Sequence, residues 1–297
     1  MLLAKAPSIF YILKKIKVEF FYSVTIAVVA SFVTYWFDLG FPNMPISVPA
    51  FLGTAISVLL SFKLGQSYDR WWEARKIWGT IVNESRSFTL QLQSYVTAGN
   101  DAVIKELALR HVAWCYSLGQ SLRGLDPLEN LQKYISENDL KKISSHNNKP
   151  LALLQLNSLQ LAELKYDGKL DIRGHIHINT TLANFSTAMG MAERIKSTVF
   201  PFTYRVFLHL MIYLFVITLS VSLGAVKPVY EIPLLLIISS GFFVLEKTAT
   251  LLQDPFENKP TDTAMTTIAT NIEINIKQLL KETDVPNPLK PHNFYAL

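Results

Sequence analysis

The fold is decided by residues 45–79, which read PISVPAFLGTAISVLLSFKLGQSYDRWWEARKIWG. Residues 45–64 contain one charged side chain, Lys63, and are long enough for a single helix to cross the hydrocarbon core of a bilayer. The rest of the stretch differs, because Trp71 and Trp72 lie there among acidic and basic residues. We therefore predict a membrane-spanning helix followed by a polar segment that contains indole side chains.

The composition agrees with a membrane protein that has a substantial polar part. Half of the 297 residues are hydrophobic and 17% are charged, whereas soluble domains carry about 25% charged residues. The mean hydropathy is +0.25. The net charge of +5 fits a nucleic-acid-binding protein or a membrane protein with basic cytoplasmic loops. The single cysteine, Cys115, excludes an internal disulfide and is expected to pack as a small apolar side chain.

Four apolar segments are candidates for crossing a bilayer, namely residues 18–37, 45–64, 206–226 and 232–252. The chain is expected to divide at these segments. Residues 1–65 hold an N-terminal helix and the first two spans, 66–203 a cytoplasmic helical region, 204–252 the last two spans, and 253–297 a cytoplasmic C-terminal helix and tail.

The long region between the second and third spans is predicted to be helical. Apolar residues recur there with a period close to 3.6, as at Ile77, Ile81, Phe88 and Leu92, and no strand-like alternation competes. Residues 263–282 form another amphipathic pattern. The fold class is therefore an all-α membrane protein with four transmembrane helices that continue into a cytoplasmic helical bundle.

The distribution of lysine and arginine predicts the orientation of the chain. Lys5, Lys14, Lys15 and Lys17 precede the first span, residues 38–44 contain no basic residue, and the middle region contains many. Because cytoplasmic loops carry the excess of basic residues, both termini are expected in the cytoplasm. This placement accounts for the net positive charge, and no nucleic-acid partner is expected.

Two interpretations of the tryptophan-rich segment remain open. Tryptophan prefers the headgroup level of a membrane, so the segment can be an interfacial anchor. Alternatively, the second span continues as one helix into the cytoplasm, since no proline interrupts residues 65–79. In that case we expect four side chains to pack against neighbouring helices, namely Tyr68, Trp71, Trp72 and Arg75.

Three ordered motifs resemble the bestrophin family in its bacterial branch. They are SYDRWWEARKIWG at 67–79, MAERIKSTVFPFTYRVFLHLMIYLF at 191–215, and LQDPFENKPTDTAMTTIATNIEINIKQLL at 252–280. The resemblance extends over roughly residues 8–282. It implies a homopentameric ion channel in the lipid bilayer of a bacterial inner membrane, with the second helix of each subunit lining the pore. Most characterised members are anion-selective, and at least one bacterial member is cation-selective.

The resemblance also implies a narrow apolar neck on the second span. Thr54, Val58 and Phe62 are spaced i, i+4, i+8 and so share one helical face. Val58 and Phe62 match the apolar neck positions, whereas Thr54 replaces the usual isoleucine, so the outer end of the neck is expected to be wetter. Ordinary helix packing is the alternative role for Val58 and Phe62.

A second, cytoplasmic constriction is implied at Ile172 or Arg173. A ring of Ile172 would be apolar, whereas a ring of Arg173 would favour anions. Arg173 can instead be a surface residue paired with Asp171. His175 and His177 are two residues apart and so lie on different faces of a helix, so we expect no metal site there.

No cofactor or catalytic residue is expected, because the sequence has no P-loop, GxGxxG, GxSxG or HExxH motif. Asp254, Glu257 and Asp262 are spread around two prolines, and we therefore predict no calcium activation.

The resemblance, together with the basic cytoplasmic region, predicts a passive channel for monovalent ions, most of all chloride. A sodium-type cation channel is the alternative within this class. A membrane-anchored scaffold or sensor that conducts nothing is the alternative outside it.

Overall fold

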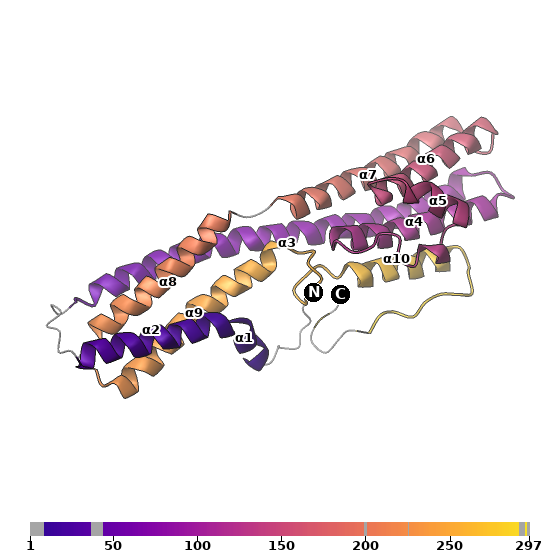
Figure 1. The fold of residues 1–297 in the computed structure, drawn as a ribbon. Coiled ribbons are helices and arrows are strands. Elements are labelled where there is room, and N and C mark those ends of the chain that lie inside the picture. The colour runs from indigo at the N-terminus through magenta and orange to yellow at the C-terminus, as the bar shows by residue number, and fades with distance from the viewer. Residues whose placement is uncertain (1–8, 37–43, 199–200, 225, 291–294, 296–297) are drawn as a thin grey trace. The chain divides into compact units, whose positions relative to one another are not determined.

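The computed structural model describes residues 9–36, 44–198, 201–224, 226–290 and 295. Within these ranges the regular elements are all helical, so the predicted helical class is confirmed (Figure 1). The helices are α1 (Ile9–Lys15), α2 (Lys17–Trp36), α3 (Ser47–Tyr95), α4 (Asp101–Leu122), the 3-10 turn η1 (Leu131–Lys133), α5 (Glu137–Ser144), α6 (Lys149–Tyr166), α7 (Ile172–Ser197), α8 (Phe202–Ser222), α9 (Pro228–Gln253) and α10 (Met265–Leu279).

The chain forms two compact units, which are described separately. The membrane unit comprises the described parts of residues 6–70 and 199–254, and the helical unit those of 71–198 and 255–297. The helix α3 belongs to both, because the boundary between the units falls within it.

Three helices of the described chain are long and apolar enough to cross a membrane: α3, α8 and α9. They contain the predicted spans 45–64, 206–226 and 232–252 apart from a few end residues. The helix α2 has 20 residues and nearly coincides with the predicted span 18–37, whose last residue lies outside the described part. A fourth crossing by α2 stays a prediction.

In the membrane unit, α2 packs against both α8 and α9, which also contact each other (Figure 1). Leu208, Ile212 and Phe243 are fully or almost fully buried in this core. Gly53 allows a close approach of α8 to α3, because a Cβ atom at this position would lie 3.2 Å from the Phe215 ring. The apolar contacts thus determine which face of α3 is covered by its own chain.

In the helical unit, α4 packs against α6, α7 and α10. The face predicted from Ile77, Ile81, Phe88 and Leu92 is confirmed, since all four side chains are buried. Tyr116 and Tyr134 also bind α10, because both hydroxyls donate to Glu273 Oε2, at 2.8 and 2.9 Å.

Capping side chains and a glycine mark the breaks between α5, α6 and α7. Asn148 is the N-cap of α6 and accepts a hydrogen bond from the Leu151 amide. Asp171 is the N-cap of α7 and accepts one from the Gly174 amide at 2.8 Å. Gly168, between these helices, has a φ of +70°, a conformation that favours glycine.

Candidate functional site

The part of α3 within the membrane unit has one covered and one open face. Ile56, Leu60 and Lys63 are buried against the rest of the unit. Thr54, Val58 and Phe62 point the other way: Val58 is 50% exposed and Phe62 is 66% exposed. The three predicted neck residues therefore form a continuous open stripe on a single chain.

The hydroxyl groups near this stripe are bonded within their own helix. Thr54 Oγ1 donates to the Ala50 carbonyl at 2.9 Å, and Ser57 Oγ donates to the Gly53 carbonyl at 2.8 Å. Such bonds to the carbonyl four residues back satisfy a hydroxyl without a second helix. The open stripe therefore presents mainly the methyl group of Thr54 and the apolar side chains of Val58 and Phe62.

Behind the stripe lies a buried polar cluster that joins α3, α8 and α9. Lys63 Nζ donates to Glu246 Oε1 at 2.6 Å and to Thr250 Oγ1 at 2.9 Å. The second carboxylate oxygen of Glu246 lies 3.3 Å from His209 Nε2. The side chains of Lys63 and Glu246 are 0% and 2% exposed. The one charged side chain of residues 45–64 is therefore paired with a carboxylate inside the protein.

A second buried carboxylate, Glu231 at the start of α9, was not singled out from the sequence. Its Oε1 atom accepts hydrogen bonds from Ser31 of α2 at 3.0 Å and from Ser220 of α8 at 2.5 Å. The signal in the sequence is weak, because serine is common in membrane helices. Polar residues buried in this way bind neighbouring helices together.

The tryptophan-rich segment is part of one uninterrupted helix, as α3 runs from Ser47 to Tyr95. Arg70 Nε donates to the Gln253 carbonyl, and Trp71 Nε1 donates to the Thr261 carbonyl, both at 2.9 Å. Tyr68 and Trp72 are about half exposed on the single chain, so their packing against neighbouring helices stays a prediction.

The two candidates for the cytoplasmic constriction both lie exposed in the first turn of α7. Ile172 is 64% exposed, and Ile176 is also exposed one turn later. Arg173 forms no ion pair within the described residues, and the expected pairing with Asp171 is not seen, because Asp171 caps the helix instead. The geometry brings both candidates to one helix end and does not select between them.

The two histidines near this helix end, His175 and His177, contact different residues. The ring of His177 stacks on Tyr95, with centroids 5.7 Å apart, and His175 contacts the Asn179 amide at 2.9 Å. Partial burial, together with the positive charge of Lys165, lowers the pKa of His175. In the described part of the chain no three His, Cys, Asp or Glu side chains are placed to hold a metal ion.

The carboxylates expected not to form a calcium loop also have protein partners. Glu257 pairs with Lys259, and Asp262 Oδ2 accepts a hydrogen bond from the Lys259 amide at 3.1 Å.

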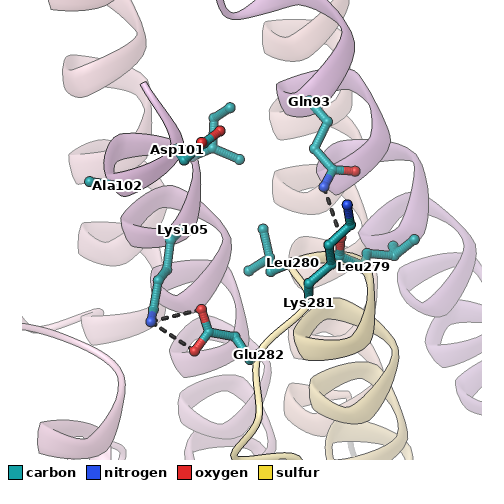
Figure 2. A pocket seen from close by; sticks show the side chains of 9 residues that line it. Gln93, Asp101, Ala102, Lys105, Leu279, Leu280, Lys281 and Glu282 are labelled. Atoms are coloured by element: carbon teal, nitrogen blue, oxygen red, sulfur yellow. Dashed lines mark hydrogen bonds and ion pairs between the residues drawn. The ribbon is translucent and has the colours of Figure 1, made fainter. Parts of the chain in front are cut away.

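The helical unit contains a cavity of about 370 Å³ at the end of α10 (Figure 2). Lys105 Nζ lies within 2.8 Å of both carboxylate oxygens of Glu282, and Gln93 donates to the Leu279 carbonyl. The charged groups thus neutralise one another, and the cavity has no strong preference for one sign of ligand. It is lined by Gln93, Asp101, Ala102, Ile104, Lys105, Leu279, Leu280, Lys281 and Glu282.

Comparison with known proteins identifies the family. A model of the Bacterial/Fungal Bestrophin protein family matches residues 8–278. The chain belongs to the bestrophin family. This confirms the resemblance drawn from the three sequence motifs.

Bestrophin relatives are similar over nearly the whole chain. The voltage-dependent anion channel-forming protein YneE of Escherichia coli K12 is 30% identical over 290 residues, which are 96% of this chain and 93% of the relative. The anion channel-forming protein RSc3414 of Ralstonia nicotianae is 29% identical and is covered over 79% of its length. The solved structure of a bestrophin homologue from Klebsiella pneumoniae is 25% identical, with a TM-score of 0.83, and the match covers 90% of this chain and 99% of that one.

Proposed function

We propose that this bestrophin is a homopentameric channel of the bacterial inner membrane that conducts monovalent anions, chiefly chloride, down their electrochemical gradient. The observation that carries the proposal is the open stripe of Thr54, Val58 and Phe62 on α3. The distribution of basic residues supports a cytoplasmic location for both chain termini.

In the proposed assembly, five copies of α3 surround a central path. Each residue of the stripe then forms a ring, and the rings of Val58 and Phe62 are apolar. A narrow apolar ring resists ions because an ion that loses water there gains no polar replacement. The buried cluster of Lys63 and Glu246 supports this arrangement, since it keeps the charge of Lys63 away from the neck residues.

The choice of anions rests on the names of the relatives, which are anion channel-forming proteins. A sodium-type cation channel is the alternative, because apolar rings do not by themselves select a sign of charge. A second constriction is proposed at the start of α7, formed by Ile172 or Arg173.

The test is conductance through the purified protein in planar bilayers. Val58→Ala combined with Phe62→Ala should raise the unitary current, because both changes widen the neck. Phe207→Ala is the matched control, since Phe207 is an exposed aromatic residue on α8 and should leave the current unchanged.

Asymmetric sodium chloride distinguishes the candidate ions. A reversal potential near the chloride equilibrium value supports the anion channel, and one near the sodium value supports the alternative. Absence of current from correctly inserted wild-type protein would favour a scaffold or sensor that does not conduct.

A further inference from the structure

The open stripe of α3 does not end at Phe62. Asp69 lies seven residues after Phe62 and eleven after Val58. At about 100° per residue, it is offset by about 20° from each of them, in opposite senses. Its direction therefore falls between those of the two proposed neck residues, about 10 Å further along the helix at 1.5 Å per residue.

Nothing in the described part of the chain covers or neutralises Asp69. The residue is exposed, and no hydrogen bond or ion pair engages its carboxylate there. The basic residues near it in sequence point elsewhere, since Lys63 binds Glu246 and Arg70 binds the Gln253 carbonyl. The stripe therefore carries an uncompensated negative charge at this level.

The surface of α3 between Phe62 and Asp69 carries no charged side chain on its exposed side. Gly65 lies between them on the exposed side, and a Cβ atom there would meet no other atom within 4 Å. Gln66 is the exposed side chain between the two levels on this side of α3, and it carries no charge that could neutralise Asp69.

We propose that Asp69 is a specificity-determining residue of the channel, which places a ring of five carboxylates on the path immediately beyond the apolar neck. This inference rests on the proposed function. A ring of one sign of charge concentrates counter-ions and repels co-ions. Asp69 thus favours cations locally and reduces the preference of the pore for anions.

The first experiment measures the chloride-to-sodium permeability ratio of Asp69→Asn from reversal potentials. Loss of the ring should raise this ratio by roughly threefold or more, as expected for unit charges about 10 Å from the ion in a partly aqueous path. The difference from wild type should be larger in 0.1 M salt than in 1 M salt, where the Debye length falls to about 3 Å. Glu163→Gln is the control, because it removes another exposed carboxylate, on α6, that has no ion pair within the described residues.

A second experiment tests the same role without requiring that the Asp69→Asn variant assembles. Cys115 is the only native cysteine and is fully buried, and burial raises the pKa of its thiol, so it does not compete for thiol reagents. Asp69→Cys can then be labelled in the assembled protein with a methanethiosulfonate that carries either a sulfonate or a trimethylammonium group. The sulfonate should keep the ratio near wild type, and the trimethylammonium should raise it.

The outcomes separate this inference from the function on which it rests. An unchanged ratio in Asp69→Asn, or equal effects of the two reagents, overturns the role of Asp69, while an increased current in the neck variant would still support the channel. Absence of current from the wild-type protein overturns both.

Discussion

Gly174 in the first turn of α7 shows how one residue determines a local structure. A Cβ atom there would lie 2.7 Å from Tyr95 Cβ and 2.7 Å from Asp171 Oδ1. Gly174→Ala should therefore destabilise the protein by about 1–3 kcal/mol, the usual cost of overpacking, because the backbone of Tyr95 cannot move freely. The measurement is the thermal midpoint in detergent.

Gly190 provides the control in the same helix. No atom lies within 4 Å of a Cβ built there, so Gly190→Ala should raise stability by about 0.5–1 kcal/mol through the better helix propensity of alanine. If both substitutions raise the midpoint, the close contact at Gly174 is not a constraint.

The burial of His111 should make the stability of the protein depend on pH. Complete burial among Phe88, Trp114 and Phe185 lowers the pKa of His111 to about 3, from an ordinary value of 6.5. Between these values the unfolded chain binds a proton that the folded chain does not. The free energy of unfolding should therefore fall as the pH is lowered from about 6.5, by at most about 1.4 kcal/mol per pH unit from this residue.

The measurement compares thermal midpoints at several pH values between 7.5 and 5. His111→Gln should show a shallower fall than the wild type, because glutamine cannot titrate and can still donate to Ser85. His146→Gln, which removes an exposed histidine, should keep the wild-type slope. Equal slopes in wild type and His111→Gln would contradict the assignment.

Residues of the site were predictable to different degrees. The stripe of Thr54, Val58 and Phe62 follows from helical spacing, and its direction was implied only by the family resemblance. The sequence did not identify Glu246 as the partner of Lys63, because a separation of 183 residues gives no indication of contact. Glu231 was missed, since its partners are two serines on other helices.

At the scale of elements, the buried pair couples α3 to α9. Lys63→Met or Glu246→Leu alone should cost about 3–5 kcal/mol, because each leaves a buried charge without its partner. The double variant should lose much less than the sum, since both charges are gone. Thermal midpoints of the wild type, the two single variants and the double variant in detergent give the coupling free energy between Lys63 and Glu246.

The exposed ion pair Lys76–Glu73 is the control for the buried pair Lys63–Glu246. Its side chains are 56% and 39% exposed, so Lys76→Met should cost about 1 kcal/mol or less. Additive losses at Lys63 and Glu246 would show that the two residues act independently.

Most helices were predictable because apolar periodicity and helix breaks are local properties. The end of α6 at Asp167 and the start of α7 at Ile172 follow from capping and a glycine turn. The length of α3 was an open alternative, since nothing local distinguishes an interfacial anchor from a continuing helix. Tertiary contacts such as the bond from Trp71 to the Thr261 carbonyl support the continuing helix and have no signature in sequence.

At the scale of the whole molecule, the open stripe is the feature that a single chain leaves uncovered. An exposed apolar stripe beside a buried ion pair is consistent with a helix that faces lipid or other copies of itself. The family, together with the relatives named as anion channels, favours the second arrangement. The proposed pore requires several chains, because each supplies only one side of each ring.

A high-resolution cryo-electron microscopy map of the assembled protein in lipid nanodiscs tests this central claim most directly. The account predicts five chains around one axis, with Val58 and Phe62 of every α3 pointing at that axis and narrowing a continuous water path. A map in which these two side chains face lipid, or in which no axial path exists, would contradict it.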